Sequence, residues 1–515
     1  MLLFTLFLFT LSQRVSAADG DSATFKVTTK SLITSISPRF IGFSIEISAA
    51  PSVFLENGFG GAPRTSFASL MNRLRVASGA QVGPSIRIGG NSADESAWIP
   101  SPTPLPNATK YRITVADLNS YAASVPAWNG TVIIDTTLLY PYNAALALAH
   151  VVAAGPVLGW TGSGSGRGLI ESIEIGNEPD LFYEKNTGGR PSTFGYVDYK
   201  KQYAAVDSVL TARGRMPGPR VQGATWCSSS HEAWSLSDFS DYVAIFNNSL
   251  ESISFHRYGT TVCGGRSTTI AALLDDKASA GLAATVANFS AVAASVGLPF
   301  YIGEGNSVSC GGAPGVSDVI AAALWALDTM FNIVAIGGKR WAFHGMPHGS
   351  YSTIVFPDTS TTTQVQPLYY GLLAFAQMTC NTSSLITIDT VVTTNPFIKA
   401  WAVIDADLIT TRVVVIHKDP SPTSSSSNAT ITIQSSTAAT KGSTTAVLTY
   451  LLPGNDGIST RWDGGISYGG LSWSTSSDGE PTGTPISVPI ESQADGSYQF
   501  DLPPFSAAFI EIYNF

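Results

Sequence analysis

Two glutamates in this chain each close an apolar, strand-like run of residues. Glu178 ends the stretch 173–178 (IEIGNE), and Glu304 ends the stretch 299–304 (PFYIGE). Only 13% of the 515 residues are charged, so carboxylates at these places are candidates for acid–base chemistry. Hydrolysis of a glycosidic bond needs such a pair: one group protonates the leaving oxygen, and the other attacks the sugar carbon or activates water. One isolated glutamate would more often be a solvent-facing strand end, but two in equivalent settings favour catalysis.

The elements that must position this pair alternate between strands and helices from about residue 40 to 380. Eight strands, most of them followed by a helical stretch, predict an α/β fold of the (β/α)8 TIM barrel type. A doubly wound open sheet is the main rival, although no Gly-x-Gly-x-x-Gly opens the first helix as its nucleotide-binding version requires. The candidate strands are residues 40–46, 84–90, 131–137, 172–177, 220–226, 252–258, 299–304 and 340–346, and the helix-like stretches include 67–77, 144–154, 196–212, 269–296, 318–336 and 368–378.

The region after residue 380 has a different pattern. Alternating β-prone runs at 397–404, 411–417, 446–452 and 507–512 are separated by turn residues, which predicts a C-terminal antiparallel β-sandwich. Residues 24–33 are β-prone and could add a strand to it. We therefore expect residues 18–38 to join the sandwich, 39–380 to form the barrel and 381–515 to form the sandwich domain. The Ser/Thr-rich tract 421–445 is expected to be an exposed, glycosylated loop.

The N-terminus is typical of a secretory signal. Residues 2–11 are almost wholly apolar, and Val15-Ser16-Ala17 predicts cleavage before Ala18, so residues 1–17 are expected to be removed. No later segment is long and apolar enough to predict a membrane anchor, and 318–337 fits a core helix better. N-linked glycans on a secreted, extracellular protein are expected at six sequons, which are at Asn107, Asn129, Asn247, Asn288, Asn381 and Asn428.

Secretion also makes the four cysteines candidates for disulfide bonds. Four cysteines allow three connectivities. We favour Cys263–Cys310, because both residues lie just beyond neighbouring candidate strands; the other two cysteines are Cys227 and Cys380.

Composition and motifs argue against several other classes of function. A net charge of −9 without a Lys/Arg cluster disfavours nucleic acid as a partner. His344 and His348 are four residues apart but fall among glycine and proline, and no partner ligands are evident, so no metal site is predicted. The stretch 465–469 matches Gly-x-Ser-x-Gly, yet it lies in the β-rich region with no helix to follow, which argues against a serine hydrolase.

A barrel of this type would place its active site at the C-terminal ends of the strands. Glu178 follows the fourth strand and Glu304 ends the seventh, so the two can face one another across a bound sugar. Other strand ends carry polar or aromatic residues, including a tyrosine that could donate a hydrogen bond to the nucleophile and keep it ionised. Each could equally be a core or turn residue. The candidate sugar-binding residues at these ends are Gly90, Asn91, Ser92, Asn177, His256, Tyr258 and Trp341.

Three motifs in this order resemble glycoside hydrolase family 79, the β-glucuronidases and heparanases. They are IGNEPD at 175–180, RIGGNS at 87–92 and IGEGNS at 302–307, and the first resembles the acid/base motif of clan A retaining glycosidases. The similarity covers most of the mature chain, and the composition is similar to that of fungal secreted members. The resemblance implies the same pairing of a (β/α)8 barrel with a C-terminal sandwich that recruits an N-terminal strand.

The resemblance also implies roles for individual residues. Glu178 would be the general acid/base and Glu304 the nucleophile, Glu46 and Asn91 would hold sugar hydroxyls, and Tyr258 would orient Glu304. No cofactor is implied.

The glucuronate carboxylate is expected to meet backbone N–H groups around Gly311 and Gly312, with a tyrosine or Arg257. The hypothesis is a retaining exo-β-glucuronidase whose partner is a carbohydrate. The alternatives are an endo-acting heparanase-like enzyme, another clan A β-glycosidase, or a non-catalytic carbohydrate-binding protein.

Overall fold

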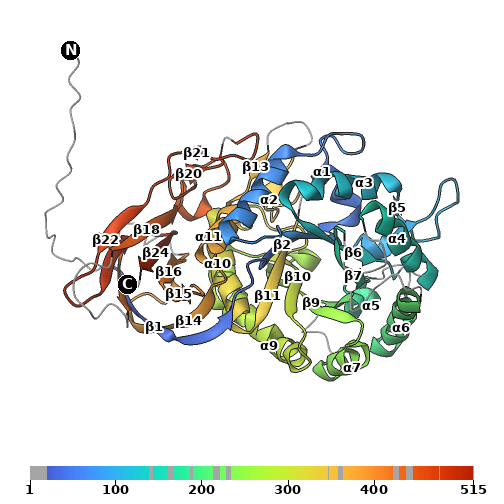
Figure 1. The fold of residues 1–515 in the computed structure, drawn as a ribbon, viewed down its shortest axis with the longest axis horizontal. Helices are drawn as coiled ribbons and strands as arrows, with labels where there is room; N and C mark the ends of the chain where they lie inside the picture. Colours follow the sequence, from blue (N-terminus) through green and yellow to red (C-terminus); the bar gives the residue numbers. More distant parts are fainter. Residues whose placement is uncertain are drawn as a thin grey trace, which may run out of the picture.

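The protein, seen here as a computed structural model, consists of a barrel domain and a β-sheet domain side by side (Figure 1). The structure describes residues 20–138, 143–159, 168–185, 190–212, 221–227, 234–345, 347–357, 363–420, 428–435, 445–474 and 476–513. The expected signal segment, residues 1–17, lies outside the described residues.

Eight parallel strands close into a barrel in the order β10-β11-β2-β3-β6-β7-β8-β9. The predicted (β/α)8 barrel is therefore confirmed, and the doubly wound alternative is wrong because the last strand pairs with the first, β11 with β2. The strands are β2 (Ile41–Glu46), β3 (Ser85–Gly89), β6 (Thr131–Thr136), β7 (Ile170–Ile175), β8 (Val221–Trp226), β9 (Leu250–Thr261), β10 (Phe300–Ser309) and β11 (Gly338–His344).

Strands β9 and β10 run past their predicted ends at residues 258 and 304. They stay paired from Phe300 with Ile253 to Ser309 with Thr261. Glu304 therefore lies within a strand rather than at its end. The register shifts between Ile302 and Glu304, which marks a local irregularity at the catalytic candidate. Such irregularities re-aim side chains next to active sites.

Helices cover the outside of the barrel. They are α1 (Ala50–Phe54), α2 (Thr65–Ser78), α3 (Val115–Ser124), α4 (Ala144–Val157), α5 (Phe182–Lys185), α6 (Tyr196–Ala212), α7 (Leu236–Phe246), α8 (Ile270–Leu274), α9 (Ala280–Ser295), α10 (Ile320–Ala335) and α11 (Pro367–Met378). The single helix expected over 269–296 is wrong. The Asp275 side chain accepts a hydrogen bond from the Lys277 backbone N–H and starts a short 3-10 turn, which separates α8 from α9.

One stretch of the described chain, Asp276–Ser295, is long and apolar enough to cross a membrane by length and composition alone. This finding differs from the sequence-based expectation of no such segment after the N-terminus. In the fold this stretch contains α9, which packs against β9, α7 and α10. Asp276 at its start pairs with Lys399 and Lys418 of the sheet domain. A core helix of a soluble protein passes the same test.

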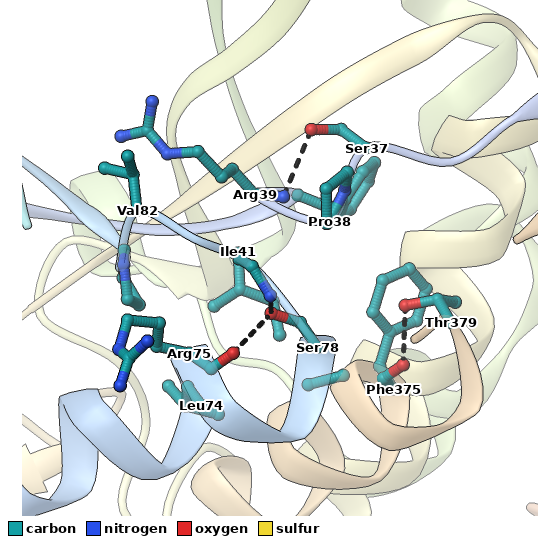
Figure 2. Close-up of a pocket in the computed structure, with 14 residues that line it drawn as sticks. Ser37, Pro38, Arg39, Ile41, Leu74, Arg75, Ser78, Val82, Phe375 and Thr379 are labelled. Carbon is teal, nitrogen blue, oxygen red and sulfur yellow. Dashed lines mark hydrogen bonds between the residues drawn. The ribbon is translucent and has the colours of Figure 1, made fainter. Parts of the chain in front are cut away.

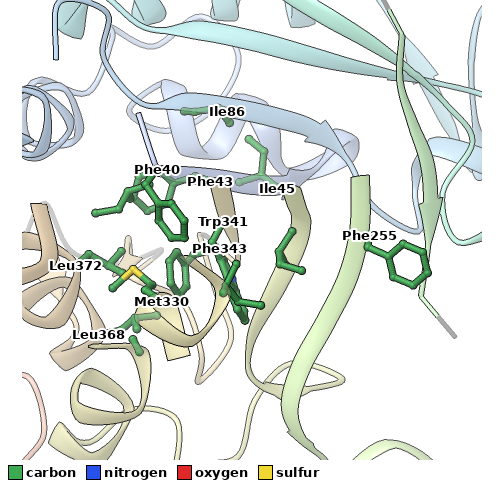
Figure 3. Close-up of a cluster of buried hydrophobic side chains, with 14 of the residues drawn as sticks. Phe40, Phe43, Ile45, Ile86, Phe255, Met330, Trp341, Phe343, Leu368 and Leu372 are labelled. Atoms are coloured by element: carbon green, nitrogen blue, oxygen red, sulfur yellow. The ribbon is translucent and has the colours of Figure 1, made fainter. Parts of the chain in front are cut away.

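The barrel strands are buried on both faces because the helices cover their outer surface. Figure 3 shows Phe43, Ile45 and Ile86 of β2 and β3 above Trp341 and Phe343 of β11, with Met330 of α10 and Leu368 and Leu372 of α11 beneath. All of these side chains are buried. This packing holds the strands in register and so sets where their C-terminal ends lie.

The N-terminal end of the barrel is closed. A cavity of only about 10 Å³ lies there between the start of β2 and the ends of α2 and α11, and it is lined by Arg39, Ile41, Leu74 and Phe375 among others (Figure 2). Beside it, Glu171 at the start of β7 is 2.7 Å from Arg39 and 2.6 Å from Arg340.

In the part of the second domain that the structure describes, twelve strands form one mostly antiparallel sheet that folds over its own apolar core. Strands β18 and β23 are far apart in the strand order, yet the Tyr450 hydroxyl of β18 donates to the Asp501 carbonyl of β23 at 2.8 Å. This confirms the predicted C-terminal antiparallel sandwich. Its strands are β1 (Ser22–Ser35), β14 (Ser384–Thr393), β15 (Ile398–Ile404), β16 (Thr410–His417), β17 (Ala429–Ser435), β18 (Thr445–Leu452), β19 (Ser467–Tyr468), β20 (Leu471–Ser472), β21 (Thr482–Gly483), β22 (Val488–Glu491), β23 (Tyr498–Leu502) and β24 (Ala507–Tyr513).

The N-terminal strand β1 joins this sheet, as expected, between β14 and β17. Its pairing with β17 is parallel. The expectation that 421–445 is one exposed loop is wrong, because β17 lies within it and buries Ala429, Ile431 and Ile433. Residues 421–427 and 436–444 of that tract lie outside the described residues.

Candidate active site

A pocket of about 700 Å³ opens at the C-terminal ends of the barrel strands. Both candidate catalytic glutamates line it, and each is only 5% exposed. The lining residues come from the C-terminal parts of β2, β9, β10 and β11 and from the loops after β3, β7, β8, β9, β10 and β11. They are Glu46, Asn91, Glu178, Leu181, Cys227, His256, Arg257, Tyr258, Gly259, Thr260, Thr261, Cys263, Glu304, Ser309, Cys310, Gly311, His344 and Tyr351.

The two glutamates converge on His256. Its Nδ1 lies 3.1 Å from Glu178 Oε1 and 4.0 Å from Glu304 Oε2. One carboxylate oxygen of Glu178, one of Glu304 and a ring nitrogen of His256 all lie within 4.8 Å of one another. The pair that is 126 positions apart in the sequence thus meets on one side of a single small pocket.

A buried arginine behind the pocket holds Glu304 in place. Arg87 is fully buried, and its Nη1 donates to Glu304 Oε2 at 2.7 Å. Its remaining N–H groups donate to four further side chains, so all five guanidinium donors are used. These acceptors are Glu174, Ser44 (3.1 Å), Asp135 (2.9 Å) and Asn177 (2.9 Å).

The surroundings of Glu304 favour its ionised form. Burial acts to raise the pKa of Glu304, but His344, His256 and Arg87 outweigh it and hold that pKa below its ordinary value. The Tyr258 hydroxyl donates to Glu304 Oε1 at 2.8 Å. A hydrogen bond to the charged form stabilises it further. Glu304 is therefore ready to act as a nucleophile or base.

Glu178 occupies an unusual backbone conformation. Its φ of 48° and ψ of 53° lie in the left-handed region, which non-glycine residues rarely adopt. Its N–H donates to the Thr225 carbonyl at 3.1 Å, and Pro179 starts a 3-10 turn after it. The preceding residue is anchored too, because Asp94 accepts the Asn177 backbone N–H at 2.8 Å. Backbone strain of this kind costs about 1–3 kcal/mol and clusters at functional sites.

Glu46 lines the pocket and is held by the loop after β3. Its carboxylate accepts the backbone N–H groups of Asn91 (3.1 Å) and Ser92 (2.7 Å), as well as the Ser92 hydroxyl. Gly90 is required here, since its φ is +74° and an added Cβ would lie 2.5 Å from Glu46 Cδ. Gly90 and Ser92 thus position Glu46, while Asn91 and Glu46 line the pocket themselves.

Two candidate sugar-binding residues lie behind the pocket wall instead of in it. The side-chain oxygen of Asn177 accepts a hydrogen bond from Arg87 Nη2. Trp341 is fully buried, donates its indole N–H to the Gly305 carbonyl at 3.2 Å and packs between Trp325 and Phe343. Neither lines the pocket.

The rim of the pocket is closed on one side by a disulfide. Cys263 and Cys310, in the loops after β9 and β10, are bonded with their Cα atoms 5.4 Å apart, which confirms the favoured pairing. Gly311 lines the pocket next to it. Gly312 does not line the pocket, and a Cβ added there would lie 2.5 Å from the Tyr351 backbone nitrogen.

Sequence reasoning missed several residues of the site. Arg87 stands in the RIGGNS motif but was not predicted as a site residue, although a lone arginine in an apolar strand is a usable signal for a buried ion pair. Its partners Asp135 and Glu174, buried carboxylates on β6 and β7, gave the same signal. Tyr351 and Cys227 lie in connecting segments, where nothing in the sequence pattern marks them.

The trio of Glu178, His256 and Glu304 is one of the described residue groups that could hold a metal ion. The hydrogen bonds already made by this trio argue for a different use. Glu304 is paired with Arg87 and Glu178 is paired with His256, so an ion would have to displace existing partners. Two buried carboxylates with unequal partners are instead suited to acid–base and nucleophilic chemistry.

No family model matches the chain. Among curated proteins, it is 26% identical over 367 residues to a β-glucuronidase of Aspergillus niger, and 22% identical over 421 residues to a β-glucuronidase of Neurospora crassa. The Aspergillus match covers 66% of this chain and 64% of the relative, so this chain spans under two thirds of that relative's length. The Neurospora match covers 73% of this chain and 71% of the relative.

Solved structures share the fold over nearly the whole chain. A 4-O-α-L-rhamnosyl-β-D-glucuronidase of Fusarium oxysporum, solved as a Rha-GlcA complex, has a TM-score of 0.74 at 18% identity and covers 95% of this chain and 99% of its own. A GH51 arabinofuranosidase of Xanthomonas axonopodis pv. citri has a TM-score of 0.65 at 12% identity, covering 96% and 100%. In sequence and in fold, the chain therefore resembles fungal β-glucuronidases.

Proposed function

We propose that this protein is a glycoside hydrolase, specifically a retaining exo-β-glucuronidase. The observation that carries the proposal is the unequal setting of the two glutamates in one pocket. Glu304 accepts hydrogen bonds from Arg87 and Tyr258, whereas Glu178 is hydrogen-bonded to His256. Retaining enzymes hold their carboxyl groups about 5–5.5 Å apart and inverting enzymes about 6.5–9.5 Å. An oxygen-to-oxygen approach within 4.8 Å supports the retaining class.

In the first step, Glu304 attacks the anomeric carbon and the glycosidic C–O bond breaks. Glu178 gives its proton to the leaving oxygen, and a glycosyl ester on Glu304 results. Arg87 keeps Glu304 aligned and anionic before the attack. In the second step, Glu178 takes a proton from water, and the water oxygen displaces Glu304 from the anomeric carbon. The sugar leaves with its β configuration kept, and both carboxyl groups return to their starting state.

A uronate carboxylate requires a cationic or N–H partner, and the pocket wall offers Arg257. Its Nη1 donates to the Cys227 carbonyl, while the buried Nε and Nη2 have no hydrogen-bond partner among the described residues. Burial lowers the pKa of Arg257, so a carboxylate ligand would stabilise the guanidinium. Gly311 and Tyr351 also line the pocket and supply a backbone group and a hydroxyl for the remaining sugar oxygens.

The shape of the site supports exo action. About 700 Å³ is within the usual size of a small-molecule pocket, and the Cys263–Cys310 disulfide bounds one side.

We also propose that the protein is secreted and carries N-linked glycans. The disulfide supports an oxidising destination, and five of the six sequon asparagines are exposed, the exception being Asn247.

A panel of aryl glycosides tests the function. We expect cleavage of an aryl β-D-glucuronide, with the β anomer appearing first in proton NMR, and much slower cleavage of the β-glucoside, β-xyloside and α-L-arabinofuranoside. A 4-O-rhamnosylated glucuronide belongs in the panel because of the Fusarium neighbour. The α anomer appearing first would contradict retention, a faster glucoside would contradict uronate specificity, and sugar binding without aglycone release at any pH would indicate a binding protein.

Arg257→Met separates the uronate proposal from catalysis in general. The variant should lose about 100-fold in kcat/KM on the aryl glucuronide, because a charge-assisted pair is lost, yet keep its activity on the glucoside. Arg266→Met is the matched control, since Arg266 is an exposed arginine on the nearby loop. Equal losses on both substrates would remove Arg257 from carboxylate recognition.

A further inference from the structure

Three acceptor groups meet in the sheet domain, where the chain enters β1 and leaves β16. One carboxylate oxygen each from Asp21 and Asp419 and a ring nitrogen of His417 lie within 4.8 Å of one another. Asp21 immediately precedes β1, His417 ends β16, and Asp419 follows two residues later. None of the three lines the active-site pocket.

The imidazole of His417 is oriented like that of a metal ligand. The side chain is fully buried, and its Nδ1 lies 3.3 Å from the Pro503 carbonyl, to which it donates. The lone pair is then on Nε2, and this buried nitrogen has no hydrogen-bond partner among the described residues. A hydrogen bond from one ring nitrogen to a backbone carbonyl, with the other nitrogen left to coordinate, is the usual arrangement of metal-bound histidine.

The two carboxylates are held by one amide. Asn395 Nδ2 donates to Asp21 Oδ2 at 2.7 Å and to Asp419 Oδ2 at 2.8 Å. The orientation of that amide is set on its other side, since Asn395 Oδ1 accepts the Phe397 backbone N–H at 2.9 Å. A neutral amide thus brings two like charges together without neutralising them. Metal-ligating carboxylates are themselves oriented by such outer hydrogen bonds.

The spacing of these atoms fits an ion better than a direct contact. His417 Nε2 lies 3.9 Å from Asp21 Oδ2, which is too long for a hydrogen bond. Zinc binds nitrogen and carboxylate oxygen at about 2.0–2.2 Å, so two ligands of one ion can be up to about 4.2 Å apart. The imidazole favours a transition-metal ion, because Ca²⁺ and Mg²⁺ prefer oxygen ligands alone.

We propose that Asp21, His417 and Asp419 form a binding site for a divalent transition-metal ion such as Zn²⁺. Water would complete its coordination. The ion would link the start of β1 to β16 and the segment after it, which are some 400 residues apart in the chain. Its function would be structural: it would fasten the N-terminal strand into the sheet domain. The sequence predicted no metal here, since two of the ligands lie far from the third and match no ligand-spacing motif.

The experiment uses the full-length secreted protein, stripped with EDTA and dialysed. Calorimetric titration with ZnCl2 should show one ion bound at this site, and melting followed by fluorescence should show a rise in Tm of a few degrees. Limited proteolysis should release the N-terminal strand more slowly when Zn²⁺ is present. Titrations with MnCl2 and CaCl2 rank the ions, and tighter binding of Ca²⁺ would contradict the imidazole as a ligand.

Variants assign the ion to these residues. His417→Gln and Asp21→Asn should each abolish the Zn²⁺-dependent rise in Tm while leaving glycosidase activity within about twofold. Asp21→Asn serves if His417→Gln fails to fold, because the Asp21 side chain is 30% exposed at a strand start. His348→Gln and Asp389→Asn, both at exposed residues, are the controls for surface binding.

A Glu304→Gln variant tests the rival trio in the active site. Zinc binding that survives both His417→Gln and Asp21→Asn, or that disappears in Glu304→Gln instead, would overturn the proposal. So would the absence of stoichiometric binding in the wild type.

Discussion

The two ends of the barrel both bury charged side chains, but their balance of charge is opposite. At the closed N-terminal end, one carboxylate, Glu171, faces the two cations Arg39 and Arg340. At the open C-terminal end, one cation, Arg87, faces the carboxylates of Asp135, Glu174 and Glu304, with Glu178 close by. A buried carboxylate is therefore not by itself a sign of function.

The pKa shifts follow from this balance. Burial acts to raise the pKa of Glu171, but Arg340 and Arg39 lower it to about 2. At the other end, burial raises the pKa of Asp135 well above its ordinary value, and the single Arg87 shared with other carboxylates does not offset it. Surplus cation at the closed end keeps Glu171 ionised at neutral pH, whereas the one guanidinium shared beside the pocket leaves Asp135 with a raised pKa. The pKa of Glu304 is lowered at that end because His344 and His256 act on it together with Arg87.

The largest expected difference is between Glu304→Gln and Glu171→Gln. Glu304→Gln should lose about 1,000-fold or more in kcat/KM, because the attacking carboxylate is gone, while its unfolding free energy stays near wild type. Glu171→Gln should keep its activity but lose about 3–5 kcal/mol of unfolding free energy, because Arg340 is left buried without its carboxylate. Aryl glucuronide kinetics and urea unfolding on both variants test this, and near wild-type activity in Glu304→Gln would remove it from the nucleophile role.

Removal of Arg87 should affect both stability and activity. Arg87→Met leaves three buried carboxylates without their cation, so the unfolding free energy should fall by about 3–5 kcal/mol. Activity should also fall, since Glu304 loses a donor that keeps it ionised and aligned. Arg340→Met at the closed end is the matched control and should lose stability alone. An Arg87→Met protein that unfolds at the wild-type urea concentration would contradict the role given to the network.

Acid should lower the unfolding free energy of the protein through protonation of Glu171 at the closed end. Its pKa is lowered from 4.5 to about 2 in the folded state, so its stabilising contribution is complete above pH 4.5 and is lost as the pH falls toward 2. The difference corresponds to about 3 kcal/mol. The unfolding free energy of the wild type, measured by urea at pH 5 and pH 2.5, should therefore fall more steeply than that of Glu171→Gln. Parallel curves for the two proteins would assign the acid sensitivity to other groups.

The smallest effect is expected from Tyr258→Phe. Loss of its hydroxyl removes a hydrogen bond to the ionised form of Glu304, so the pKa of Glu304 should rise. The acidic limb of the kcat/KM–pH profile should move upward by up to about one pH unit, with a loss of about tenfold at the optimum. Tyr301→Phe is the control, because Tyr301 stacks with Arg340 at the closed end. An unmoved acidic limb would mean that Tyr258 only packs against Glu304.

Much of the fold could be predicted because it depends on local patterns. Helix α6 was predicted with its observed bounds, Tyr196–Ala212, and the barrel strands within a few residues of theirs. The errors occurred where contacts between distant segments decide the outcome. Strand β10 continues past Glu304 because β9 remains beside it, and β17 forms in a Ser/Thr-rich tract because β1 and β23 flank it.

The sequence by itself determined which residues could do chemistry and which element carries each of them. Glu178 and Glu304 were recognisable because a charged group at the end of an apolar run is costly without a use. Only the tertiary structure decided their partners: Arg87 behind Glu304, His256 between the two glutamates, and Trp341 behind the pocket wall instead of in it. The physical reason is that periodicity fixes which way a side chain points within its own element, whereas closure of the barrel fixes which elements meet.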